Sequence, residues 1–128
     1  TPGLAARYAD ELNLPFAPVT FFAEQRDRVR AACDAVGRDP GTMRFSAALV
    51  VCCGADEREI AHRAGRIGRE PTELRENGAA GTPDEVLATL RTYADAGASR
   101  IYLQVLDLDD LDHLSLLADA VLPAVADW

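Results

Sequence analysis

The chain has 128 residues, of which 48% are hydrophobic and 27% are charged, a composition typical of one soluble globular domain. Its formal net charge of −8 argues against a nucleic-acid partner, because a phosphate backbone needs a basic face that displaces its counterions. No apolar run approaches the roughly 18 residues of a membrane span, so we expect no membrane partner.

The chain has three cysteines, whose redox state depends on the cellular compartment of the protein. Because the first residues lack the charged and apolar regions of a signal peptide, we expect a cytoplasmic protein with reduced thiols. Cys52 and Cys53 are adjacent at the end of an apolar run, whereas zinc sites favour cysteines separated by two residues. We therefore interpret the cysteines as buried hydrophobic side chains and expect no metal site.

The first predicted elements are a helix tail, a short strand and a long helix. Residues 4–10 resemble the end of a helix, and residues 12–16 form a short apolar strand that is interrupted and followed by prolines. Thr20 can cap the next helix, whose apolar residues recur at helical spacing until Gly37 ends it.

The middle of the chain predicts a second strand and three helices. Residues 43–53 are apolar for most of their length, as in a strand buried on both faces of a parallel sheet. Asp56 and Glu59 then predict a capped helix start. The glycines and prolines of residues 68–80 predict a short helix between loops. The TPDE stretch that starts at Thr82 is a strong helix start, with Thr as N-cap, Pro at the first helical position and Glu at the third.

Residues 100–106 are the third predicted strand, and the last helix follows from Leu111 until Pro123 disturbs its end. Strands separated by helices predict parallel pairing through right-handed crossovers. Because a (β/α)8 barrel needs about 250 residues, we expect one α/β domain over residues 1–128 that holds the C-terminal three βα units of an incomplete TIM barrel. A three-stranded doubly wound sheet is the alternative.

An acidic run, LDLDDLDHL, joins the third strand to the last helix. It does not fit an EF-hand loop, because Leu111 stands where such a loop needs Asp or Asn after Asp107 and Asp109. Asp109 and His113 can share a helical face, but two ligands are too few for a metal site. The helix dipole favours each acidic residue of a first turn by roughly 0.3–1 kcal/mol. We therefore interpret the run as a helix start.

Four stretches of the chain resemble a known enzyme family: LAARYADELN, AACDAVGRDP, GTPDEVLATLRTYADAGASRIYLQ and LDLDDLDHLSLLADAVLP. They are similar to the C-terminal part of luciferase-like monooxygenases, in particular the branch called F420-dependent oxidoreductases. The resemblance covers nearly the whole chain and keeps the order of its elements. It implies a TIM barrel that binds FMN or F420 at the carboxyl ends of its strands, transfers hydride or oxidises a small organic substrate with oxygen, and works as a dimer or larger assembly.

The chain departs from this family at two places. Many members have Trp where this chain has Leu12, and the family's Gly-rich phosphate-binding turn would precede the segment that begins with Thr1. The resemblance therefore implies that the first five βα units and the main phosphate-binding turn are absent from this chain. We expect a fragment that is inactive alone and that associates with itself or with the missing N-terminal barrel half.

The resemblance also implies candidate site residues at the ends of the strands. Asn13, Pro15 and Phe16 end the strand where the family's sixth loop approaches the cofactor or substrate, with turn chemistry and packing as the alternative. Gln104 can hydrogen-bond the cofactor ring or a substrate carbonyl, with a satisfied interior amide as the alternative. Asp107 is the candidate contact to the substrate. His62, beside Arg63 in a helix, is interpreted as a surface residue, as nothing pairs it with a nucleophile.

These observations favour part of a flavin- or F420-dependent oxidoreductase or monooxygenase. The alternative is a non-catalytic truncated barrel module that self-associates through open sheet edges and exposed apolar surface. A small doubly wound binding domain has less support, because no GxGxxG motif is present. The sequence leaves open the substrate, the catalytic residues and the choice between F420 and FMN.

Overall fold

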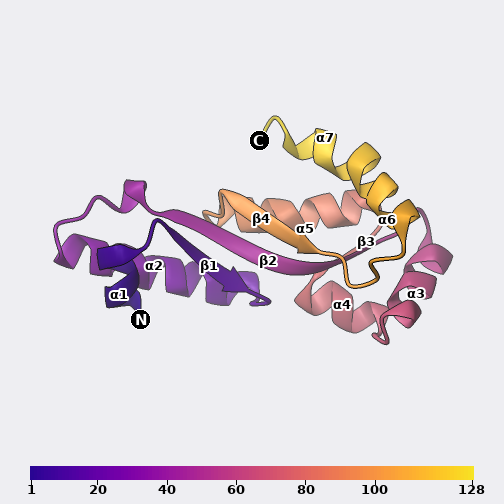
Figure 1. Ribbon diagram of the computed structural model, residues 1–128, viewed down its shortest axis with the longest axis horizontal. Helices are drawn as coiled ribbons and strands as arrows, with labels where there is room; N and C mark the ends of the chain where they lie inside the picture. Colours follow the sequence, from indigo (N-terminus) through magenta and orange to yellow (C-terminus); the bar gives the residue numbers. More distant parts are fainter. The chain divides into compact units, whose positions relative to one another are not determined.

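The computed structural model describes residues 1–128 and divides them into two compact units. Unit 1 comprises Thr1–Ala48 and Thr92–Tyr102, and unit 2 comprises Leu49–Arg91 and Leu103–Trp128. Each unit combines helices with strands, as expected for an α/β chain (Figure 1). The longest strand, β2 (Arg44–Cys53), contributes its first half to unit 1 and its second half to unit 2.

Unit 1 is built on the parallel pairing of β1 (Glu11–Pro15) with the first half of β2, which runs from Glu11 opposite Arg44 to Pro15 opposite Ala48. Strand β4 (Arg100–Gln104) also pairs with β2. The remaining elements of this unit are α1 (Pro2–Tyr8), α2 (Val19–Ala35), a 3-10 turn (Pro40–Thr42) and the end of α5 (Pro83–Asp95).

Helix α2 supplies much of the core of unit 1. Its buried residues Phe22, Val29 and Cys33 share one face at helical spacing. The Phe22 ring meets the Tyr93 ring edge-on, with 6.0 Å between the centroids. The predicted cap at Thr20 is wrong: the helix begins two residues earlier, because Pro18 is the N-cap and its carbonyl accepts the first helical hydrogen bond, from the Phe22 N–H (3.0 Å).

Unit 2 packs helices around the second half of β2 and a short strand. Its elements are α3 (Glu57–Arg66), α4 (Pro71–Asn77), β3 (Ala79–Gly81), most of α5, α6 (Leu111–Leu116), a π-helical turn (Leu117–Val121) and α7 (Leu122–Val125). Helices α3 and α4 lie beside each other (Figure 1). Together with β2 and β3 they enclose an apolar cluster of Val50, Cys52, Ile60, Ala64, Leu74 and Ala80.

Strand β3 corrects the predicted count of three strands to four. It pairs parallel with β2, Ala79 lying opposite Val51 and Gly81 opposite Cys53. The segment is three residues of Ala and Gly, so it shows neither β-branched residues nor a measurable period. A glycine precedes it because a Cβ on Gly78 would lie 2.6 Å from the carbonyl oxygen of Val50.

The other predicted strands are present with small shifts at their ends, and the predicted helix caps at Asp56 and Thr82 are confirmed. The Asp56 side chain accepts the Glu59 N–H (2.9 Å), and the Thr82 hydroxyl accepts the Glu85 N–H (3.4 Å) while the Glu85 carboxylate accepts the Thr82 N–H (3.2 Å). None of the helices is long and apolar enough to cross a membrane.

Candidate functional site

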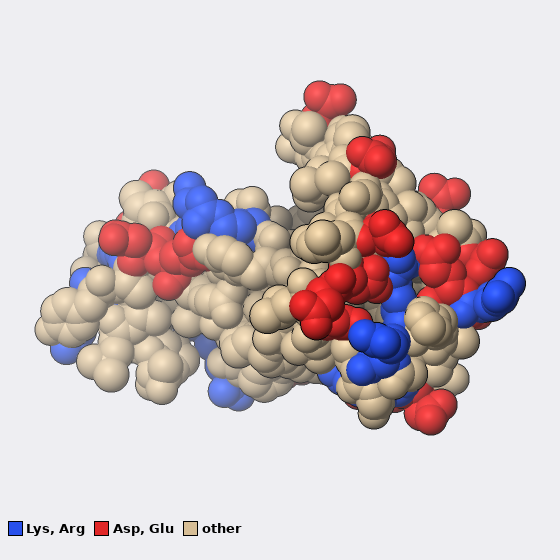
Figure 2. Space-filling view, turned by 45° about the vertical axis from the view of Figure 1, so that its right-hand side comes forward, with Lys and Arg blue, Asp and Glu red and all other residues tan.

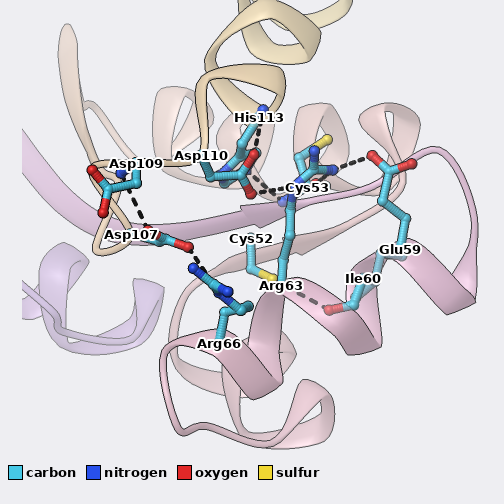
Figure 3. A network of polar contacts seen from close by, with 10 residues as sticks. All are labelled: Cys52, Cys53, Glu59, Ile60, Arg63, Arg66, Asp107, Asp109, Asp110 and His113. Carbon is cyan, nitrogen blue, oxygen red and sulfur yellow. Dashed lines mark hydrogen bonds and ion pairs between the residues drawn. The ribbon is translucent and has the colours of Figure 1, made fainter.

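Strand β2 ends at Cys53, and side chains from two helices bond both backbone groups of this residue. The Cys53 N–H donates to Nε2 of His113 at 3.0 Å, and its carbonyl accepts from Nη1 of Arg63 at 2.9 Å (Figure 3). Arg63 comes from α3, and His113 comes from the first turn of α6. Because a buried backbone group needs a partner, these two side chains fix the carboxyl end of the strand.

Arg63 is the central cation of this network and is only 8% exposed. Its Nε donates to Oδ2 of Asp110 at 2.8 Å, and its Nη1 also pairs with Glu59, one helical turn earlier on α3. A buried charge is tolerated only when it is paired and hydrogen-bonded. The hydrogen bond from Arg63 is the main reason why the pKa of Asp110 lies below its ordinary value.

Asp110 also caps α6, because its Oδ1 accepts the His113 N–H at 3.0 Å. One carboxylate therefore serves the helix start with one oxygen and the buried arginine with the other. The sequence interpretation of the acidic run as a helix start is confirmed at this residue, while its pairing with Arg63 was not predicted.

His113 is 4% exposed, and its environment favours the neutral ring. Burial, followed by the charge of Arg63, lowers the pKa of His113 below its ordinary value of 6.5. Because Nε2 accepts the Cys53 N–H, its lone pair must be free, which places the ring proton on Nδ1. A buried imidazole held in this way is a structural acceptor and is not available as a general base.

A cleft of about 460 Å³ opens beside this network. It is lined by Glu59, His62, Arg63, Arg66, Asp107, Asp109, Asp110 and Asp112. Acidic and basic side chains crowd together on this side of unit 2 (Figure 2). Five carboxylates face two arginines here, so the cleft disfavours an anionic ligand and suits a neutral polar or cationic molecule. No group of three or more His, Cys, Asp and Glu side chains is placed to hold a metal ion.

The structure places Asp107 in this cleft. Its carboxylate pairs with Nε of Arg66 at 3.4 Å and accepts the Asp109 N–H at 3.2 Å (Figure 3). His62 also lines the cleft and is exposed, as the sequence predicts. Gln104 is the exposed last residue of β4 and is not among the residues that line the cleft.

The other predicted site residues lie together in unit 1, at the end of β1. Asn13 donates from Nδ2 to the Ser46 hydroxyl on the neighbouring strand at 3.0 Å. Pro15 ends the strand, and Phe16 follows with an exposed side chain and a φ of 56°. A positive φ is uncommon for a bulky residue, and the Phe16 N–H is bonded to the Ala48 carbonyl at 2.8 Å.

Sequence reasoning missed Arg63, Asp110 and His113 as one network. One signal was present: Arg63 lies three residues after Ile60 and beside Ala64, so it falls on the apolar face of α3. The sequence also shows its carboxylate partner Glu59 one helical turn earlier. It does not show the contacts of Arg63 to β2 and to the start of α6, because these contacts join distant parts of the chain.

The F420 and FMN implied by the resemblance both carry a phosphate, and the starts of α3 and α5 do not fit one. The N-terminus of α3 is capped by Asp56 and followed by Glu57 and Glu59, and the N-terminus of α5 is occupied by the Thr82–Glu85 capping box. The Glu59 N–H of α3 is bonded to the Asp56 carboxylate, and the Glu85 N–H of α5 is bonded to the Thr82 hydroxyl. The acidic side chains at both helix starts repel a phosphate. The exposed amides of Asn13 and Gln104 fit an uncharged ring edge.

No family model and no curated protein matches this chain. Solved structures do match. The coenzyme F420-dependent tetrahydromethanopterin reductase of Methanopyrus kandleri gives a TM-score of 0.74 at 14% identity, over 96% of this chain and 47% of that chain. A monooxygenase of Streptomyces bottropensis gives 0.73 at 20% identity, over 98% of this chain and 45% of that chain.

A third similar structure is the oxygenating constituent of 3,6-diketocamphane monooxygenase from Pseudomonas putida, a type II Baeyer–Villiger monooxygenase in complex with FMN. Its TM-score is 0.67 at 15% identity, over 95% of this chain and 45% of that chain. The chain spans less than half the length of each of the three. The resemblance predicted from the sequence is therefore confirmed for the fold: the chain shares it with part of the F420- and FMN-dependent luciferase-like monooxygenases.

Proposed function

We propose that this chain forms the C-terminal half of a (β/α)8 oxidoreductase of the luciferase-like kind, which uses F420 or FMN to oxidise or reduce a small organic molecule. The observation that carries the proposal is the fold match, which takes in 96% of this chain but 47% of the F420-dependent reductase. The strands that complete the barrel come from outside these 128 residues.

The candidate site residues take limited roles in this proposal. Pro15, Phe16 and Gln104 lie at the carboxyl ends of β1 and β4, the ends at which barrel enzymes bind their ligands, and Asn13 lies in the middle of β1. We propose that each of them contacts the cofactor ring. The phosphate is bound elsewhere, because the starts of α3 and α5 do not fit it. Asp107 contacts the substrate from the acidic cleft.

A chimeric barrel tests this proposal. The chain replaces the segment of the Methanopyrus kandleri reductase to which it is similar, and F420 binding is followed by fluorescence. We expect a folded chimera to bind F420, and we expect Asn13→Ala and Gln104→Ala to weaken binding about fivefold each, because one hydrogen bond contributes about 1 kcal/mol. A folded chimera that does not bind F420 contradicts the proposal.

The isolated chain provides the complementary measurement. We expect no sub-micromolar binding of F420 or FMN in a titration of the 128-residue protein, because it offers no phosphate site. Sub-micromolar binding by this chain would show that it is not an inactive half-barrel.

The second candidate is a non-catalytic module that self-associates. Several large apolar side chains of unit 2 are exposed: Leu106, Leu108, Leu111, Leu114, Leu122 and Trp128. Such exposed apolar surface favours association. Light scattering after size-exclusion chromatography tests this candidate by measuring the oligomeric state. A stable compact monomer at high concentration contradicts self-association.

A further inference from the structure

The network at the end of β2 contains a buried histidine whose protonation is incompatible with its contacts. The ring of His113 accepts the Cys53 N–H through Nε2. A protonated imidazole has two N–H donors and no acceptor, so it would direct a hydrogen at the Cys53 N–H. Proton uptake by His113 therefore requires the contact to break.

The charged groups that act on His113 come from α3 and from the segment that leads into α6. Arg63 and Glu59 belong to α3, Asp110 caps α6, and Asp107 lies in the segment between β4 and α6. From β2, the thiols of Cys52 and Cys53 are buried. Arg63 opposes a positive charge on His113, whereas the three carboxylates favour it. All three carboxylates are already paired with an arginine: Asp110 and Glu59 with Arg63, and Asp107 with Arg66.

We propose that Arg63, Asp110 and His113 form a pH-sensitive clamp, which fastens residues 105–110 and the start of α6 to the carboxyl end of β2 and opens when His113 takes up a proton. The clamp joins three elements of unit 2 through four hydrogen bonds: Cys53 to His113, Arg63 to Cys53, Arg63 to Asp110, and His113 to Asp110. Opening would release Asp107, and with it one wall of the acidic cleft. This inference concerns unit 2 alone and does not depend on the proposed function.

The direction of the pH effect follows from proton linkage. The closed clamp binds the proton on His113 less well than the open clamp, whose histidine has an ordinary pKa. The stability of the closed clamp relative to the open clamp is therefore greatest above pH 6.5. It decreases as the pH falls towards the lowered pKa of the closed form. In this window the open population rises about tenfold per pH unit, because opening takes up one proton.

Hydrogen exchange at the Cys53 amide measures this opening in the full chain. After correction for the intrinsic pH dependence of exchange, we expect its protection to fall about tenfold per pH unit below 6.5. His113→Gln keeps an acceptor oxygen near the place of Nε2 and cannot titrate in this range, so its Cys53 protection should not change with pH. His62→Gln is the matched control, because it removes the exposed histidine of the same helix as Arg63, and it should retain the pH dependence of the parent protein.

The unaltered protein supplies a second test that needs no variant to fold. The chain has two histidines, so their ring ¹⁵N signals are assigned with His62→Gln alone. We expect the signal of His113 at neutral pH to show a proton on Nδ1 and a free lone pair on Nε2. A proton on Nε2, or a Cys53 amide that keeps its pH dependence in His113→Gln, overturns the proposal.

Discussion

Each unit holds an arginine that is paired with a carboxylate, but in unit 1 the arginine is exposed and in unit 2 it is buried. In unit 1, Nη1 of Arg100 donates to Glu11 at 3.1 Å, and the guanidinium lies 6.0 Å from the centroid of the Tyr102 ring. In unit 2, Arg63 is almost completely enclosed and bonds Asp110 and the end of β2.

The difference shows how burial determines what an ion pair contributes. Water screens the exposed pair in unit 1, and such pairs add little to stability. In unit 2, Arg63 and His113 have exchanged water for fixed partners, and the loss of one partner leaves the others unsatisfied. Two groups of similar composition therefore have different roles: the exposed one is a surface feature, and the buried one organises a strand end.

The largest effect is expected when Arg63 is removed. Arg63→Met keeps most of the side-chain volume but leaves Asp110 without its cation and the Cys53 carbonyl without its donor. We expect the free energy of unfolding to fall by about 3 kcal/mol, measured by urea denaturation. Arg100→Met is the matched control in unit 1 and should change the free energy far less. A similar loss in both variants would mean that burial does not distinguish the two groups.

A smaller effect is expected from a methyl group next to the same strand end. A Cβ on Gly54 would lie 2.7 Å from the Ile60 backbone nitrogen, so Gly54→Ala should destabilise the protein by about 2 kcal/mol. Gly65→Ala, in α3 of the same unit, meets no atom within 4 Å. It should instead stabilise by about 0.5–1 kcal/mol, because alanine has the better helix propensity. Equal effects of the two substitutions would show that the strand end is loosely packed.

The smallest effect concerns thiol reactivity, which reports on the two units separately. Cys33 lies in unit 1, and Cys52 and Cys53 lie in unit 2. All three are buried, and burial raises the pKa of Cys53 to about 11, so none should react rapidly with a thiol reagent in the native protein. In Arg63→Met we expect faster modification of Cys52 and Cys53 but not of Cys33, measured by peptide mass spectrometry. Faster modification of Cys33 alone would contradict the assignment of the network to unit 2.

Local signals in the sequence predicted the local structure well. The helix caps at Asp56 and Thr82 need only residues three positions apart, and the apolar run of β2 indicates its burial directly. The three-residue strand β3 was missed because Ala and Gly give no periodic signal, and it forms only beside β2. The cap at Thr20 was wrong because a proline two positions earlier already started the helix.

The site was less predictable for a related reason. The acidic run was correctly interpreted as a helix start, yet Asp110 meets Arg63 across 47 positions, and His113 meets Cys53 across 60. Only tertiary structure brings these residues together. The choice of Asn13, Pro15, Phe16, Gln104 and Asp107 depended on the family resemblance, and their roles toward cofactor and substrate stay predictions.

Double-mutant cycles test most directly the claim that the buried group organises unit 2 while the exposed group does not. One cycle combines Arg63→Met with Asp110→Asn, and the other combines Arg100→Met with Glu11→Gln, with unfolding free energies measured for every variant. We predict a coupling of about 1–3 kcal/mol between Arg63 and Asp110 and a coupling within experimental error between Arg100 and Glu11. No coupling between Arg63 and Asp110, or an equal coupling in both cycles, would contradict the account.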